Sequence, residues 1–114
     1  LCSTMRAGIT LNDQAKAFSL VTGIEMKIED LNKAAERIIN LERLYNVKMG
    51  YSRKNDTLPK RFIEEPMPSG SAKGQKVDLE RLLDEYYEIM GWNSNGIPTD
   101  KKLEELGLIQ FSIS

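Results

Sequence analysis

The stretch LNKAAERIINLERLYNVKMG, residues 31–50, carries the clearest structural signal in this chain. Its apolar side chains recur at steps of three and four positions: Leu31, Ala34, Ala35, Ile38, Leu41, Leu44 and Tyr45. This spacing predicts an amphipathic helix from about Ile28 to Lys48, ended by Gly50. Charged side chains fall on the other faces of that helix: Glu36, Arg37, Glu42 and Arg43.

A shorter helix is predicted ahead of this one. Thr10 and Asp13 have the spacing of an N-terminal capping pattern, which places the start of the helix at Leu11. Apolar residues continue the helical spacing for two to three turns, and Gly23 provides a stop.

Residues 51–76 are predicted to form a long loop. The segment contains three prolines and two glycines within about 26 residues, more than a compact domain normally carries without structure. It is either disordered or laid across a surface outside this chain. Embedded apolar side chains favour the ordered alternative, together with a short turn of helix at about Lys60–Glu64. These side chains are Leu58, Phe62, Ile63 and Met67.

A third helix is predicted up to Gly91, on an apolar stripe of six residues. The stripe consists of Leu79, Leu82, Leu83, Tyr86, Tyr87 and Met90. Trp92 follows at once, and an Asn/Gly turn then spans residues 93–96. We expect Tyr86, Tyr87 and Trp92 to close a small core around this turn rather than to stack on a ligand.

The last predicted helix is short. Thr99 is a typical N-cap with Asp100 in the first turn, and Gly107 follows residues 101–106 as a stop. The tail LIQFSIS alternates enough for a brief strand or an extended docked segment, and its period does not decide between them. The sequence therefore predicts an all-α fold over residues 1–114, with about four helices and one long ordered loop.

Composition excludes several kinds of protein. Sixteen basic residues against 17 acidic ones give a net charge of −1, which argues against a nucleic-acid partner. No run of 18 apolar residues marks a membrane span. Without histidine and with Cys2 as the one cysteine, the chain cannot build a structural zinc site or a Cys/His or Ser/His nucleophile. A single cysteine fits a reducing compartment such as the cytoplasm. The chain opens on Leu1 without a signal-peptide pattern, so we expect the protein to begin further upstream.

Four ordered motifs carry a resemblance to a known family. They are NLERLYNV, SRKNDTLPKRF, EEPMPSG and the series YYEIMGW, GIPT and KLEELGL. In this order and spacing the chain resembles the carboxy-terminal region of the tungsten-containing aldehyde:ferredoxin oxidoreductases over nearly its whole length. The resemblance implies a piece of a larger multidomain enzyme that oxidises aldehydes to carboxylic acids with water and passes electrons to ferredoxin.

The resemblance also implies cofactors. Members of the family hold tungsten between two pyranopterins, beside a four-iron, four-sulfur cluster. Three cluster cysteines come from an upstream group, and the fourth ends a pterin-binding motif, Asp-x-x-Gly-Leu-Cys-x. Leu1, Cys2 and Ser3 match the end of that motif, so the resemblance implies Cys2 as the fourth cluster ligand. The Asp and Gly of the motif are not among these 114 residues. One cysteine cannot hold such a cluster alone, so we expect the isolated chain to be inactive and without cofactor.

Other candidate sites receive no catalytic role. Arg53 and Lys54 could face an anion or ferredoxin, but a charged loop is usually a solvated surface. Two pairs of neighbouring carboxylates point in different directions on a helix and have no apolar pocket to shift their pKa values. These pairs are Glu64 with Glu65 and Asp84 with Glu85. The segment SGSAKG lacks the spacing of a phosphate-binding loop.

Two hypotheses follow from the sequence. The first is the C-terminal part of a tungsten enzyme, whose partners are its remaining domains, ferredoxin and an aldehyde. The second is a stand-alone helical interaction module that docks through the long loop and has no redox role. If the loop normally lies against other domains, the isolated chain should expose apolar surface and self-associate.

Overall fold

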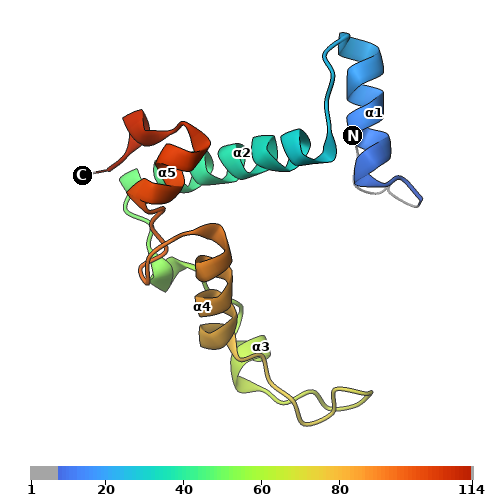
Figure 1. Cartoon of the computed structure of the whole chain (residues 1–114). Coiled ribbons are helices and arrows are strands. Elements are labelled where there is room, and N and C mark those ends of the chain that lie inside the picture. The colour runs from blue at the N-terminus through green and yellow to red at the C-terminus, as the bar shows by residue number, and fades with distance from the viewer. Residues whose placement is uncertain (1–7, 114) are drawn as a thin grey trace. The chain divides into compact units, whose positions relative to one another are not determined.

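The computed structural model describes residues 8–113, and these residues are helical without a β-strand (Figure 1). Contacts divide the chain into two compact units, Leu1–Ile39 and Asn40–Ser114. The predicted all-α fold is confirmed for the described residues.

The N-terminal unit contains α1 (Leu11–Thr22). Its start is fixed reciprocally, because the Asp13 amide donates to Thr10 Oγ1 over 3.2 Å while the Thr10 amide donates to Asp13 Oδ2 over 2.9 Å. The Thr10 hydroxyl donates to Asp13 Oδ2 over 2.6 Å, and this bond together with the one from the Thr10 amide lowers the pKa of Asp13, since both favour its ionised form. Gly23 ends the helix in the left-handed conformation. Both predicted ends of this helix are confirmed.

Helix α2 (Ile28–Lys48) has the predicted bounds and crosses from the first unit into the second. Asp30 accepts a 3.0 Å hydrogen bond from the Lys27 amide at its beginning. Acidic side chains in this first turn stabilise the positive end of the helix dipole.

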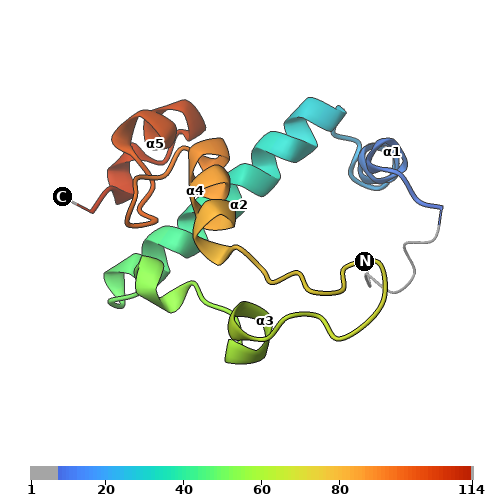
Figure 2. The same cartoon turned by 90° about the horizontal axis from the view of Figure 1, so that it is seen from below.

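The second unit is built from short elements around the C-terminal part of α2. In chain order they are η2 (Arg53–Asn55), α3 (Lys60–Glu64), α4 (Leu79–Met90), α5 (Asp100–Leu106) and η3 (Ile109–Phe111). Helix α5 lies beside the C-terminal part of α2 in both views (Figures 1 and 2). The core of the second unit is a cluster of four leucines: Leu44, Leu103, Leu106 and Leu108.

The tail does not form the strand that its alternation allowed. Leu108 is buried, and its amide donates to the Leu103 carbonyl over 2.7 Å, which completes the end of α5. The chain then turns, with the Phe111 amide bonded to the Leu108 carbonyl at 2.9 Å. A strand needs a neighbour to satisfy its backbone, and the described residues contain no other strand.

The long loop is ordered by its own backbone. The Met67 amide donates to the Gln75 carbonyl, and the Gly74 amide donates to the Met67 carbonyl, both over 2.9 Å. A 3.1 Å bond from the Val77 amide to the Phe62 carbonyl closes the base. The predicted helical turn at Lys60–Glu64 is confirmed as α3. The surface against which this loop would lie stays a prediction.

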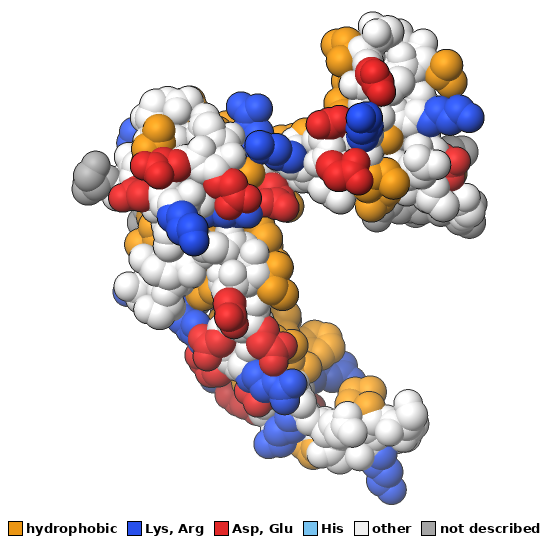
Figure 3. Space-filling view, viewed as in Figure 1, with side chains coloured by type: hydrophobic (Ala, Val, Ile, Leu, Met, Phe, Trp, Pro, Cys, Tyr) orange, Lys and Arg blue, Asp and Glu red, His pale blue; other side chains and the backbone are white. Residues whose placement is uncertain are grey.

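Large apolar side chains remain exposed on the second unit. Three of them lie on α4: Leu82, Tyr86 and Ile89. Figure 3 shows hydrophobic side chains at the surface beside acidic ones. The opposite part of the same apolar arc, Tyr87 and Met90, is buried. Among residues 8–113, no helix has both the length and the apolar character that crossing a bilayer requires.

Candidate functional site

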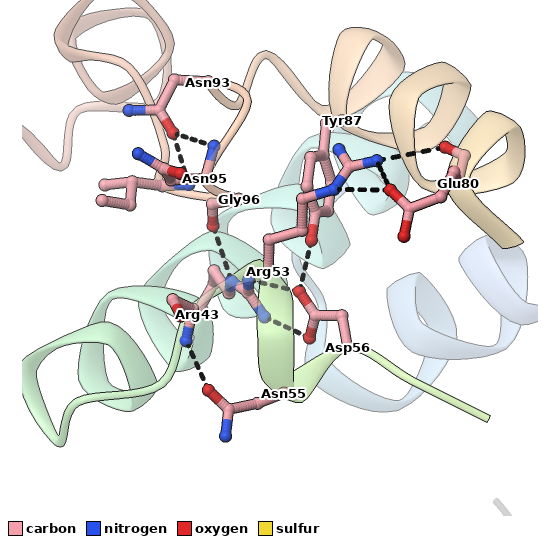
Figure 4. A network of polar contacts seen from close by, with 11 residues as sticks. Arg43, Arg53, Asn55, Asp56, Glu80, Tyr87, Asn93, Asn95 and Gly96 are labelled. Atoms are coloured by element: carbon pink, nitrogen blue, oxygen red, sulfur yellow. Dashed lines mark hydrogen bonds and ion pairs between the residues drawn. The ribbon is translucent and has the colours of Figure 1, made fainter. Parts of the chain in front are cut away.

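A buried polar network forms the centre of the second unit (Figure 4). Arg43 projects from α2 with its side chain only 10% exposed, and its two terminal nitrogens bind Asp56 at 2.8 and 2.5 Å. Its Nε donates to the Gly96 carbonyl over 2.7 Å. One guanidinium therefore joins α2 to the segment after η2 and to the turn after α4. The forked geometry of arginine suits this bidentate pairing.

Tyr87 completes the coordination of Asp56. Its hydroxyl donates to the Oδ2 atom that also accepts from Arg43. The Arg43 guanidinium holds the pKa of Asp56 below its usual range, and the Tyr87 hydroxyl adds to that effect. Burial, together with the hydrogen bond to Asp56, raises the pKa of Tyr87 to about 12. At neutral pH Asp56 is therefore charged and Tyr87 is neutral.

The aromatic side chains pack around this network. Trp92 Nε1 donates to Asn40 Oδ1 over 2.8 Å, and the Arg43 guanidinium lies 4.9 Å from the Trp92 ring centroid. Tyr86 meets Trp92 edge-on at 5.5 Å. The predicted ring cluster is confirmed, with Tyr87 buried, Trp92 half-buried and Tyr86 still partly exposed.

The Asn/Gly turn presents a carbonyl to Arg43. Asn93 Oδ1 accepts from the amides of Asn95 and Ile97 at 3.0 and 3.1 Å, which tightens the turn. Gly96 has φ of +75°, and an added Cβ would overlap the Arg43 guanidinium and lie 2.8 Å from the Tyr87 hydroxyl. Only glycine satisfies both the left-handed backbone and the close approach.

The sequence led us to expect Arg53 in a solvated charged loop. In the structure its side chain is instead held by ion pairs. It bonds to Glu80 and Asp84 of α4, each at 2.6 Å, and lies 5.4 Å from the Tyr87 ring centroid. Its amide also donates to the Asn95 carbonyl over 3.0 Å. Arg53 therefore fastens η2 to α4, whereas its neighbour Lys54 is exposed.

The candidate carboxylate pairs do not form shared sites. Asp84 pairs with Arg53, whereas Glu85 turns to Arg81 over 2.8 Å on the other side of α4. Glu64 and Glu65 are both exposed at the end of α3. Neither pair is held together as acid–base chemistry would require.

The network is suited to holding segments in place. Every buried side-chain nitrogen and oxygen in the described part of the chain has a hydrogen-bond partner. Asp56 and Tyr87 titrate far from neutral pH, on opposite sides, so neither suits proton transfer. Within residues 8–113, no three His, Cys, Asp or Glu side chains converge on a possible metal site. The cofactor residues expected from the sequence, Leu1, Cys2 and Ser3, lie outside the described residues.

Sequence reasoning missed the residues that build this network. The sequence placed Arg43 outside the apolar stripe of α2 and gave Asn40 no role, yet both are buried. Asp56 lay in a predicted loop without a visible partner. The available signal was weak: two polar residues three positions apart on the helix, and an arginine within reach of Tyr87 and Trp92 only after folding.

Comparison with protein families identifies relatives over almost the whole chain. A family model described as aldehyde ferredoxin oxidoreductase, domains 2 and 3, matches residues 1–108. The tungsten-containing aldehyde ferredoxin oxidoreductase of Pyrococcus furiosus is 43% identical over 112 residues, covering 97% of this chain and 18% of that protein. Its counterpart in Thermococcus kodakarensis is 42% identical with the same coverage.

Two further relatives have different names. The WOR-like subunit of an aliphatic sulfonate oxidoreductase of P. furiosus is 40% identical over 86 residues, 68% of this chain and 14% of that protein. Among solved structures, the BamBC active-site complex of benzoyl coenzyme A reductase, bound to 1,5-dienoyl-CoA, matches with a TM-score of 0.72. It is 31% identical over 90% of this chain and 14% of that one. The chain thus spans less than a fifth of the relatives it matches.

Proposed function

This chain belongs to the aldehyde ferredoxin oxidoreductase family, and on that premise we propose that it is the C-terminal helical part of a tungsten-containing aldehyde oxidoreductase. The parent enzyme would oxidise an aldehyde to a carboxylic acid in the cytoplasm and pass the electrons to ferredoxin. The isolated 114 residues would not catalyse this reaction.

One observation carries the proposal: 43% identity to a tungsten-containing aldehyde ferredoxin oxidoreductase over 97% of the chain. The sulfonate oxidoreductase subunit matches only 68% of the chain, which favours an aldehyde as the substrate. Relatives named for such different substrates share this region, so the choice of substrate is expected to depend on other parts of the parent.

Cys2 would supply one thiolate to a four-iron, four-sulfur cluster. Such a cluster takes four cysteines, so the other three would come from outside these 114 residues, whose one cysteine is Cys2. When bound, tungsten would supply the two-electron oxidation of the aldehyde with water as the source of the added oxygen atom, and the cluster would relay the electrons toward ferredoxin. Leu1 and Ser3 would flank the ligand in the pterin-contacting turn. Within the second unit, the Arg43 network would hold α2, the segment after η2 and the turn after α4 rigidly together.

Metal analysis and low-temperature EPR of the anaerobically purified full-length protein test this function. We expect tungsten, about four irons per protein and a reduced-cluster signal. The Cys2→Ser variant should lose the signal, whereas a Ser3→Ala variant should keep it. A full-length protein without tungsten, molybdenum or cluster iron would overturn the proposal.

The exposed apolar side chains favour a second candidate, the stand-alone interaction module. The genomic reading frame separates the two candidates. An upstream Cys-x-x-Cys-x-x-x-Cys group and an Asp-x-x-Gly in the same frame support the enzyme. A start codon directly before Leu1 supports the module.

A further inference from the structure

The C-terminal part of α2 leaves an apolar face uncovered. Leu41 and Tyr45 lie one turn apart and are 42% and 66% exposed. They belong to the stripe from which the helix was predicted, yet in this part of the stripe only Leu44 packs inward, together with the polar residues Asn40 and Arg43. An apolar stripe on a helix is normally buried against a neighbouring element. Among the described residues of the second unit, Leu41 and Tyr45 remain exposed.

The stripe forms one wall of a groove. The other wall is the segment that follows α5, including Phe111 and Ile113, which are 49% and 41% exposed. The groove encloses about 550 Å³. Its complete lining is Leu41, Leu44, Tyr45, Lys48, Gln110, Phe111, Ser112 and Ile113. Five of these eight side chains are aliphatic or aromatic and only Lys48 is charged, so the groove suits an apolar occupant.

The groove opens onto the leucine core. Leu44 lines the groove and also belongs to the buried cluster with Leu103, Leu106 and Leu108. That core is small, because only seven hydrophobic residues in the described part of the chain are buried. Apolar side chains placed in the groove would extend the core by another layer and would remove Leu41 and Tyr45 from water.

We propose that this groove is the docking site for an apolar segment of the parent enzyme's own chain, from outside these 114 residues. The inference rests on the proposed function. The length of the parent favours this occupant, because the curated and solved relatives carry more than four-fifths of their residues outside the matching region. A segment of the same polypeptide is also present at a high effective concentration, which an independent partner lacks.

Lys48 defines the polar end of the docking segment. It follows the stripe at the C-terminal end of α2 and forms no ion pair within residues 8–113. The segment should therefore place apolar side chains over Leu41 and Phe111, and a carboxylate or free carbonyl oxygen near the Lys48 ammonium.

Cysteine labelling of the full-length enzyme tests the docking site. A Tyr45→Cys variant is treated with a maleimide under native conditions, and the labelled peptide is quantified by mass spectrometry. A Glu104→Cys variant on the exposed, charged face of α5 is the matched control. We expect labelling at Tyr45→Cys to be slower by roughly tenfold or more, because reaction would require local opening. Equal native rates would overturn the proposal.

Two further measurements cover the alternatives. Oxidative footprinting of the unaltered enzyme, which needs no folded variant, should show Tyr45 and Phe111 protected relative to the denatured enzyme. Absence of protection would overturn the proposal. Protection that disappears when the enzyme is diluted to monomers would assign the groove to a second copy, and would also overturn it.

The outcome is separable from that of the proposed function. Protection at Tyr45 in a protein that lacks tungsten and cluster iron would uphold the docking site and defeat the redox function. A metal-loaded enzyme in which Tyr45→Cys is labelled as fast as the control would uphold the redox function and defeat the docking site.

Discussion

On either side of the buried Leu44, the C-terminal part of α2 reverses the usual order of a surface helix. On one face, Asn40 and Arg43 are polar and buried; on the other, Leu41 and Tyr45 are large, apolar and exposed. The buried polar groups all have partners within the second unit, at Trp92, Asp56 and Gly96. The apolar groups stay exposed among the described residues of that unit.

This difference separates two ways of completing a helix. A buried guanidinium is tolerated only where hydrogen bonds and a counter-charge replace water, so its partners must belong to the same folded unit. An apolar stripe can stay exposed until a partner binds, because its exposure costs free energy without preventing the local fold. The polar face therefore fixes this unit internally, and the apolar face is the one to which we assign the docking segment.

The largest effect is expected where the polar face is broken. Arg43→Met removes the counter-charge of Asp56 and leaves that partly buried carboxylate without its ion pair. We expect a loss of about 3–5 kcal/mol in the free energy of unfolding. Urea unfolding followed through Trp92, the one tryptophan among these residues, measures it. Arg43→Lys keeps the positive charge but loses the forked guanidinium, so its free energy of unfolding should fall between those of the original chain and the Arg43→Met variant. A Met variant as stable as the original would show that the network adds no stability.

A smaller loss is expected from Gly96→Ala. The new Cβ would collide with the Arg43 guanidinium and strain a φ of +75°, at a cost of about 3 kcal/mol. Gly107→Ala is the matched control, because its φ is +67° and no atom lies within 4 Å of the added carbon. The control should lose only about 1 kcal/mol, for backbone strain. Equal losses measured by the same urea unfolding would mean that the close approach to Arg43 is unimportant.

A Tyr87→Phe change sharpens the comparison through pH. It deletes one hydrogen bond to Asp56 and leaves the ring, so we expect a loss of about 1–2 kcal/mol at neutral pH. The folded pKa of Tyr87 is raised to about 12, above an ordinary value of 10. The neutral hydroxyl therefore stabilises the fold fully below pH 10, and this contribution is lost as the pH rises toward 12. Unfolding curves across that range should fall steeply for the original chain and less steeply for the variant.

The smallest effect is expected at a comparable pair on the surface. Arg81 bonds to Glu85 one turn away on α4, and both side chains are mostly exposed. Because water already solvates both groups, Arg81→Gln should leave the unfolding midpoint unchanged within error. A shift approaching that of Arg43→Met would show that exposure does not distinguish the two arginines.

Most of the helices could be predicted from local signals. Thr10, Gly23, Thr99 and Gly107 each mark a helix end through bonds to nearby backbone, and the structure has those ends. The tail was harder, because its alternating pattern has no strand to pair with among residues 8–113, and the buried Leu108 directs it into a turn.

The polar network could not be predicted in the same way. Helical periodicity identifies the apolar side of α2 and assigns Arg43 to solvent by default. Its burial depends on Asp56 and Gly96, which lie 13 and 53 positions later in the chain. The candidate ligand Cys2 lies outside the described residues, so its role stays a prediction.

The span of the bond from Arg43 to Gly96 also sets an order of events during synthesis. At about 5–20 residues per second, the 53 positions between them take roughly 3–10 s to be translated. Asp56 follows Arg43 by only 13 positions, but throughout that interval the guanidinium lacks the turn carbonyl that binds its Nε. The second unit can therefore close only after the ribosome has passed the Asn/Gly turn.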